Sequence, residues 1–169
     1  MRVAQTQRLV LRHLTFEDAG FLCRMLNEPS WLRFIGDRGV RTPQDAQRYI
    51  QEKFVALYES DGFGMYLLEL KDGGSPIGLC GLVKRDSLPG PDIGFALLTQ
   101  FEGHGYAFEA SKAVMNHARE EIHLTKLLAI VNPDNVGSIR LLERLGFSHE
   151  GAYRTPKENN DLMLYTTSL

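Results

Sequence analysis

The chain has 169 residues, 43% hydrophobic and 24% charged, with a net charge of −2, which predicts one compact domain spanning 1–169 and no general attraction to nucleic acid. No apolar run approaches the ~20 residues that cross a bilayer, and the start of the chain lacks the pattern of a signal peptide. Cys23 and Cys80 lie in separate apolar segments and suggest no disulfide framework. From these features together we expect a cytoplasmic protein with no nucleic-acid and no membrane partner.

The N-terminal third predicts one strand and two helices. Residues 8–12, with the sequence Arg-Leu-Val-Leu-Arg, are predicted to form the first strand. Residues 15–18, with the sequence Thr-Phe-Glu-Asp, resemble a capping box that opens an amphipathic helix to about Asn27. A loop rich in arginine, glycine and aromatic residues is expected at 29–41. A second helix then covers 42–59, with proline at its first helical position.

The remainder of the chain alternates between strands and helices. The glycine-rich segment 72–76 is a strong hairpin signal between two strands. Gly146 is expected to end the last helix in a left-handed conformation. These elements predict an α+β fold around a mostly antiparallel sheet. Strands are expected at 65–71, 77–84, 91–98, 127–131, 147–153 and 162–167, and helices at 105–120 and 135–145.

The turn Gly103-His104-Gly105-Tyr106-Ala107 joins a buried-looking strand to the start of a helix. Glycine lets a ligand approach the backbone, and a helix start offers unpaired amide donors, so the turn suits a phosphate. A Rossmann motif is excluded because Phe108 stands where the third glycine is required, and a P-loop because no Gly-Lys-Ser/Thr follows. For such a turn taken alone, a purely structural tight turn is the commoner explanation.

Two further segments add specificity to the glycine turn. Residues 131–147, together with 93–95 and 103–110, resemble the signature of the GNAT acetyltransferases. Residues 8–12 followed by 17–19 are similar to the branch that contains the ribosomal-protein N-terminal (alanine/serine) acetyltransferases. The resemblance covers nearly the whole chain. It implies one N-acetyltransferase domain with a GNAT-type acyl-CoA N-acyltransferase fold: a mixed, mostly antiparallel central sheet with helices on both faces and two splayed parallel strands.

The resemblance also implies acetyl-coenzyme A (acetyl-CoA) as co-substrate. Its pantetheine arm would lie between the splayed strands, and one backbone amide there would polarise the acetyl carbonyl. The family's Arg/Gln-x-x-Gly-x-Gly/Ala pattern fits two registers: Gln100 begins the literal match, whereas the following residues favour Glu102, an acidic residue in place of the usual Arg or Gln. The residues implied for the coenzyme are Ala96, Leu97 and Leu98 for pantetheine, and Gly103, His104, Gly105, Tyr106 and Ala107 for the pyrophosphate.

Asn135 and Ser138 occupy the family's Asn-x-x-Ser positions at the start of the last helix, where the resemblance implies coenzyme contact. Asn135 suits a helix cap equally well. Many relatives carry, four residues after the serine, a tyrosine that protonates the departing thiolate, and here that position is Leu142. Ser138, directly or through water, is therefore the candidate acid.

No general base stands out. Asp92 lies at the mouth of a central strand, where some relatives place a carboxylate, so it joins Ser138 and Asn135 as a candidate catalytic residue. Glu69 and Glu150 are alternatives, although a solvated position on a strand explains each of them better. The five histidines have no metal-ligand spacing, so we expect no metal cofactor.

The expected acceptor is an amine, and the lack of a conspicuous base favours one of low pKa. Deprotonating a lysine-like amine of pKa ~10.4 at pH 7 costs roughly 4.6 kcal/mol, whereas an α-amine of pKa ~8 costs roughly 1.4 kcal/mol. This favours a peptide or protein N-terminus. The resemblance places 31–41 over the acceptor site, where its three arginines, Trp31 and Phe34 would receive an acidic or aromatic substrate, or the aromatic residues would anchor the loop.

The function expected from the sequence is acetyl transfer from acetyl-CoA to a primary amine, with direct attack of the nitrogen on the thioester. One alternative is a catalytically idle coenzyme A-binding or sensing domain, which the missing tyrosine and base favour. Another is an acyltransferase that uses a different acyl-CoA or a small-molecule amine. A homodimer through the terminal strands is common in the family.

Overall fold

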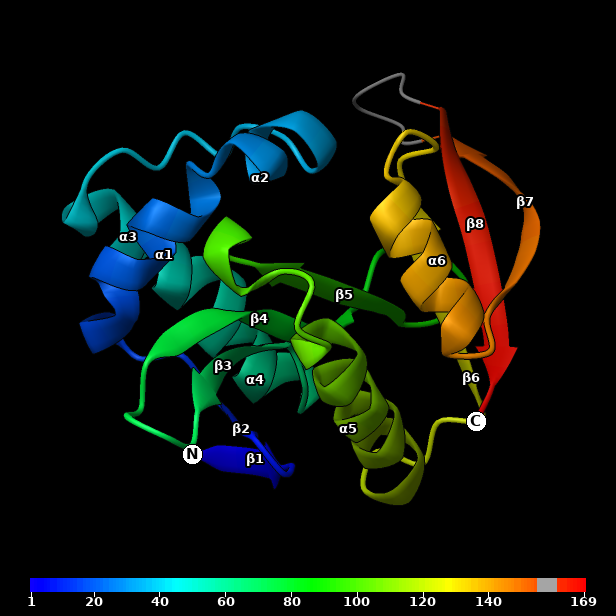
Figure 1. The fold of residues 1–169 in the computed structure, drawn as a ribbon, viewed down its shortest axis with the longest axis horizontal. Helices are drawn as coiled ribbons and strands as arrows, with labels where there is room; N and C mark the ends of the chain where they lie inside the picture. The colour runs from blue at the N-terminus through cyan, green and yellow to red at the C-terminus, as the bar shows by residue number, and fades with distance from the viewer. Residues whose placement is uncertain (155–160) are drawn as a thin grey trace.

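An eight-stranded sheet runs through the part of the chain that the computed structural model describes, residues 1–154 and 161–169 (Figure 1). The strands follow the spatial order β1-β2-β3-β4-β5-β6-β8-β7, and neighbours are antiparallel except β5 and β6. This confirms the predicted α+β fold with a mixed, mostly antiparallel sheet. The strands are β1 (Arg2–Gln5), β2 (Leu9–Arg12), β3 (Met65–Leu70), β4 (Pro76–Val83), β5 (Asp92–Leu97), β6 (Lys126–Val131), β7 (Ser148–Arg154) and β8 (Asp161–Ser168).

The β3–β4 hairpin forms where the glycine-rich segment predicted it. Gly73 and Gly74 have φ angles of +82° and +65°, in the left-handed region that glycine enters without a steric cost. Strand β1 is the one not expected from the sequence, because its four residues lack a run of large apolar side chains. It is added at the edge of the sheet by antiparallel pairing with β2.

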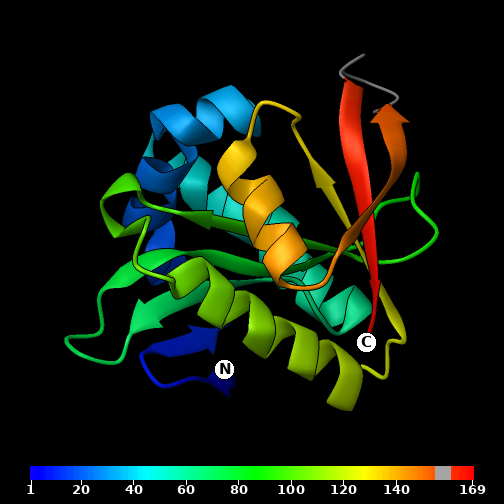
Figure 2. The same ribbon diagram turned by 45° about the vertical axis from the view of Figure 1, so that its right-hand side comes forward.

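Helices cover both faces of the sheet, as expected. The C-terminal helices α5 (Tyr106–Glu120) and α6 (Val136–Arg144) lie on one face, and the helices of the N-terminal third lie on the other (Figure 2). The latter are α1 (Ala19–Leu26), α2 (Pro29–Phe34), α3 (Pro43–Ile50) and α4 (Ala56–Asp61). Short segments η1 (Phe16–Asp18) and η3 (Thr99–Phe101) are 3-10 helices, and η2 (Gln51–Val55) is a π-helix. No helix of the described residues is long and apolar enough to cross a membrane.

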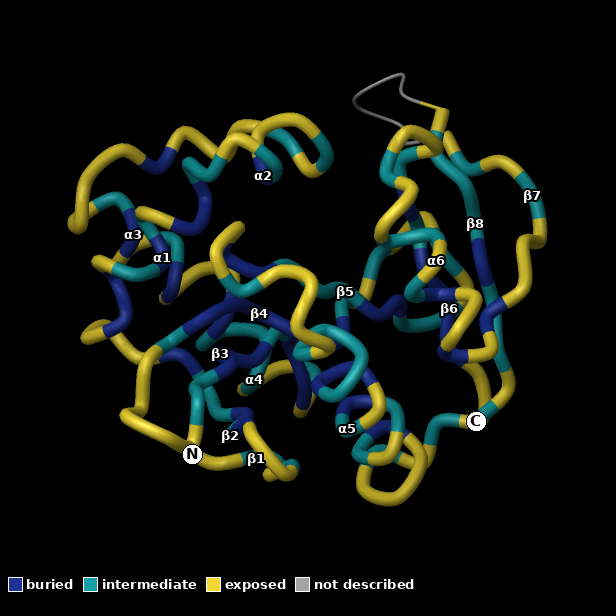
Figure 3. The backbone as a smooth tube through the Cα atoms, viewed as in Figure 1, coloured by how far each residue is buried: buried dark blue, intermediate teal, exposed yellow. Residues whose placement is uncertain are grey.

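Each face of the sheet has its own hydrophobic core. Tyr66 and Leu68 of β3 pack on the side of α5, whereas Leu67 between them packs with α1 and α3, as strand alternation requires. Ala110 and Val114 of α5 are fully buried, and their small side chains let the helix lie close to the sheet. Figure 3 shows this burial concentrated in β3 and β4, while much of β7 is exposed.

The expectation of a loop throughout 29–41 is wrong, because residues 29–34 form α2. Pro29 begins the helix at a position where its missing amide costs nothing, and Trp31 is only 9% exposed and packs in the core with α1 and α3. A helix of six residues is too short to show a periodicity in the sequence, and burial of Trp31 stabilises it. The predicted second helix is present as α3, η2 and α4 in one continuous run.

The parallel strands β5 and β6 separate along their length. Among the described residues their register contains one pair, Asp92 with Leu128, next to a hydrogen bond from the Leu128 amide to the Pro91 carbonyl (3.1 Å). Toward their C-terminal ends the strands diverge, and the sheet opens there. The two splayed parallel strands are therefore confirmed.

Candidate functional site

A cleft of about 730 Å³ opens where the C-terminal ends of β5 and β6 separate. Its walls come from α1 and α2 on one face of the sheet and from α5 and α6 on the other, and β5 borders it between them. The principal lining residues are Met25, Trp31, Phe34, Ile35, Phe95, Ala96, Leu97, Glu102, Gly103, Gly105, Tyr106, Ala107, Phe108, Asp134, Asn135, Ser138, Arg140, Leu141 and Arg144.

The backbone of β5 aims one of its amides at this gap. Successive amides of a strand point alternately toward its two neighbours. The Leu98 amide donates to the Ile77 carbonyl at 2.9 Å, on the β4 side. By alternation the Ala96 amide also points toward β4, and the Leu97 amide points toward β6, where the strands have separated. Of the three residues expected to bind pantetheine, Leu97 therefore offers an unpaired ladder donor, and Leu98, 2% exposed, lies outside the cleft.

The glycine turn lies at the start of α5, as predicted. Gly103 and Gly105 have φ angles of +75° and +82°, which explains the need for glycine at both positions. The first hydrogen bond of α5 runs from the Glu109 amide to the Gly105 carbonyl (3.1 Å), so the first three helix amides have no acceptor within the helix. Except for the exposed His104, the turn from 103 to 107 lines the cleft. Together the donors and the helix dipole suit an anion.

Asn135 and Ser138 stand on the opposite side of the same opening. The Asn135 side chain caps α6 by accepting a hydrogen bond from the Ser138 amide at 3.2 Å. Both residues also line the cleft, so capping and a role toward a ligand are compatible. Leu142 is 1% exposed and packs in the core, and its neighbour Leu141 lines the cleft instead. Helix α6 therefore presents a serine and no phenol to the site.

Asp92 lies at the closed end of β5 and β6, outside the cleft. It is 2% exposed, and its Oδ1 accepts a hydrogen bond from Nε of Arg85 at 2.9 Å. Burial raises the pKa of Asp92 to about 6, and the charge of Arg85 acts against that rise. The structure does not bring Asp92 together with Ser138 and Asn135. Its contacts indicate a structural role at the point where the two strands still pair.

The other carboxylates considered from the sequence also lie away from the cleft. Glu69 of β3 accepts a hydrogen bond from Arg12 at 2.5 Å, and Glu150 is exposed on the edge strand β7. Glu102 does line the cleft. Burial, followed by the nearby charge of Glu28, raises the pKa of Glu102.

Helix α2 forms an apolar wall of the cleft that the sequence indicated only in part. Trp31, Phe34 and Ile35 line it, and the Arg33 guanidinium lies over the Phe34 ring at 4.7 Å. Within the described residues the buried Nε1 of Trp31 has no hydrogen-bond partner. Trp31 therefore anchors the segment to the core and also lines the cleft, and its contact with a substrate stays a prediction.

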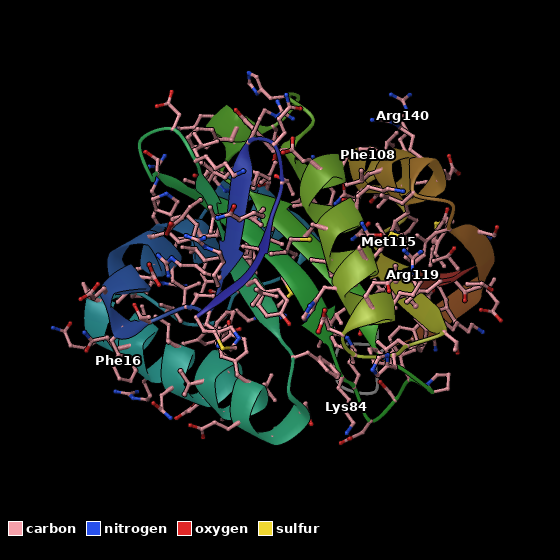
Figure 4. The ribbon with its side chains drawn as sticks, turned by 90° about the horizontal axis from the view of Figure 1, so that it is seen from below. Phe16, Lys84, Phe108, Met115, Arg119 and Arg140 are labelled. Carbon is pink, nitrogen blue, oxygen red and sulfur yellow. The ribbon has the colours of Figure 1, made fainter. Side chains whose placement is uncertain are left out.

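The opposite wall contains cations that sequence reasoning missed. Arg140 and Arg144 of α6 line the cleft, and the Arg144 guanidinium lies over the Phe108 ring at 4.5 Å. Figure 4 shows Phe108 of α5 and Arg140 of α6 at the same end of the molecule. Arg140 and Arg144 are four residues apart, which puts both on one side of the helix, and this spacing is the signal that could have found them. No group of three or more potential metal ligands occurs within residues 1–154 and 161–169.

Comparisons with known proteins agree with this geometry. The family described as acetyltransferase (GNAT) domain matches residues 8–148. The chain is 29% identical over 155 residues to an N-acetyltransferase named p20 of Bacillus licheniformis, covering 91% of this chain and 86% of that protein. It resembles the crystal structure of an acetyltransferase from Agrobacterium tumefaciens with a TM-score of 0.81 and 26% identity, covering 97% of this chain and 92% of that one.

A structure of RimL, a ribosomal L7/L12 α-N-protein acetyltransferase in complex with coenzyme A, shares the fold. Its TM-score is 0.85 over 100% of this chain and 98% of that one. The identity is 18%, so this likeness concerns the fold alone.

Proposed function

The chain belongs to the GNAT acetyltransferase family, and on that premise we propose that it transfers the acetyl group of acetyl-CoA to a primary amine by direct attack. Family membership makes it an acetyl-transferring enzyme. The donor and the acceptor are the proposed part.

One observation carries the proposal: residues from both faces of the sheet line a single cleft beside the C-terminal end of β5, where β5 and β6 no longer pair. The face of α5 and α6 offers the amides of the glycine turn, which suit a pyrophosphate. The face of α1 and α2 offers an apolar wall without charged lining residues. A coenzyme on the first side and an amine on the second would meet in the gap, as direct transfer requires.

Acetyl-CoA would supply a thioester whose carbonyl carbon is attacked by the uncharged amine nitrogen. The Leu97 amide faces the gap and would donate to the carbonyl oxygen as negative charge develops on it. The new C–N bond forms, the C–S bond breaks, and the amine proton passes to solvent. Ser138, directly or through a bound water, would give a proton to the departing thiolate.

We propose the α-amine of a peptide as the acceptor. Glu102 and Asp134 are the carboxylates among the described residues that line the cleft, and neither is hydrogen-bonded to Ser138, so an amine of low pKa reacts most easily. The alternative of an idle coenzyme A-binding domain is favoured by the composition of α6, which has leucine at 142 and no tyrosine that could act as a phenolic acid.

Release of free thiol from acetyl-CoA tests the proposal. The panel consists of peptides with a free N-terminus, the same peptides with a blocked N-terminus and a free lysine, and small amines. We expect turnover with the free α-amine and little with the blocked peptides. Binding of coenzyme A by calorimetry without turnover across the panel would favour the idle domain, and preference for a small amine would correct the acceptor.

A further inference from the structure

Arg8, in the turn between β1 and β2, reaches the glycine turn, 96 residues away in the sequence. Its Nε donates to Oε2 of Glu109 at 2.7 Å, and its Nη1 donates to the carbonyl of His104 at 2.9 Å. The guanidinium also lies over the Tyr106 ring, 4.4 Å from its centre. One side chain therefore joins both ends of the turn to the first turn of α5.

Glu109 holds this arginine in place from the other side. Its Oε1 accepts hydrogen bonds from the backbone amide of Arg8 at 2.8 Å and from the hydroxyl of Thr6 at 2.5 Å. Burial acts to raise the pKa of Glu109, but the hydrogen bonds from Thr6 and Arg8 outweigh it and lower the pKa. The carboxylate thus stays charged and fixes the direction of the guanidinium.

The third nitrogen of Arg8, Nη2, has no hydrogen-bond partner within the described residues and lies beside Gly105. It is the one atom within 4 Å of the point where a Cβ of Gly105 would be, at 3.4 Å. The side chain is 42% exposed, so an anion lying over Gly105 can reach Nη2 from solvent. Gly105 lines the cleft and also a second, open groove of about 740 Å³ between the β1–β2 hairpin and α5. Arg8 borders this second groove, whose other charged lining residues are Lys112, Arg144, Glu109, Glu120 and Glu121.

We propose that Arg8 positions the glycine turn and contributes a positive charge to the phosphate groups of the coenzyme through Nη2. This deepens the proposed function and rests on it. The contribution has a physical reason in Glu102, because this acidic residue lines the cleft next to Gly103 and Gly105. A cation delivered from the β1–β2 turn compensates for it. A guanidinium suits the task because Nε is held by Glu109 and Nη1 holds the His104 carbonyl of the turn, which leaves Nη2 for a ligand.

The test measures affinity by calorimetry for coenzyme A, dephospho-coenzyme A and pantetheine in wild type, Arg8→Ala and Arg8→Lys. We expect Arg8→Ala to weaken coenzyme A binding roughly ten- to a hundredfold, the size of one hydrogen bond to a charged group. Pantetheine, which lacks the phosphates, should change by less than about twofold, a distinction that general damage to the cleft would not produce. An equal loss with dephospho-coenzyme A identifies the pyrophosphate as the partner, and a smaller loss identifies the 3′-phosphate.

Arg8→Lys keeps a charge but cannot hold Glu109 and His104 and also face the ligand, so an intermediate affinity is expected. Arg119→Ala, an exposed arginine near the other end of α5 (Figure 4), is the matched control and should bind like wild type. Retention of wild-type affinity in Arg8→Ala, or equal losses for coenzyme A and pantetheine, would overturn the inference alone. A wild-type protein that binds no coenzyme A would overturn the proposed function and this inference with it.

Discussion

Replacing Gly105 with alanine tests whether the glycine turn is a ligand site or only a tight turn. The φ angle of Gly105 is +82°, and an L-residue in this left-handed region costs roughly 1–2 kcal/mol. Alanine also lowers the conformational entropy of the unfolded chain, which stabilises the folded state by about 0.4–1 kcal/mol. The free energy of unfolding should therefore fall by about 1 kcal/mol in total. The new methyl group would meet only Arg8 Nη2, at 3.4 Å, so the fold accommodates it.

Coenzyme A binding should suffer more than folding does. The methyl group would occupy the surface over which the phosphates approach the helix amides. Loss of one hydrogen bond to a charged group costs about 1.5–3 kcal/mol, or at least roughly tenfold in affinity. Urea unfolding measures the loss of folding stability, and calorimetry with coenzyme A measures the loss of affinity.

The β3–β4 hairpin provides a matched control. Gly73 also has a φ angle of +82°, and no atom lies within 4 Å of its Cβ position. Gly73→Ala should therefore lose about the same free energy of unfolding while binding coenzyme A normally. If both variants bind coenzyme A as wild type does, the turn is structural and our placement of the phosphate site is refuted.

Three further predictions concern the cleft and the closed end of the splayed strands. Ser138→Ala should lower kcat for thiol release several-fold more than it weakens coenzyme A binding; equal small effects would leave Ser138 without a role in proton transfer. Asn135→Ala removes the α6 cap and should lower the free energy of unfolding by about 1 kcal/mol in urea titrations, and an unchanged value would contradict the capping geometry. Asp92 has a pKa of about 6 against an ordinary 3.8, so the stability it contributes below about pH 4 is lost as the pH rises through 6, by up to roughly 3 kcal/mol. Asp92→Asn should therefore reduce the change in the free energy of unfolding between about pH 4 and about pH 6 and retain turnover. A large loss of turnover would return Asp92 to the mechanism.

Local features of the chain could be predicted because they depend on neighbouring residues. The two glycines of the turn 103–107, the hairpin glycines and the Asn135 cap each reflect a backbone conformation that a few adjacent residues determine. Strand and helix periodicity located most elements in the same way. Strand β1 and helix α2 were not predicted, because each is short and is stabilised by packing or pairing with other elements.

The direction in which a group points could not be predicted, because it depends on register and packing. The sequence placed Ala96, Leu97 and Leu98 together, but strand pairing with β4 turns the Leu98 amide toward Ile77 and leaves the Leu97 amide facing the gap. The sequence likewise identified Asp92 as a central carboxylate. The position of the one β5–β6 pair puts Asp92 at the closed end, away from Ser138.

By itself the sequence determined the family, the fold class and the glycine turn that suits a phosphate. Only the tertiary structure decided which groups surround that turn. Arg8 and Glu109 are separated by 101 residues, and no local pattern links them. They meet because the β1–β2 hairpin and α5 pack at the same end of the sheet, and long-range packing is what an isolated sequence pattern does not encode.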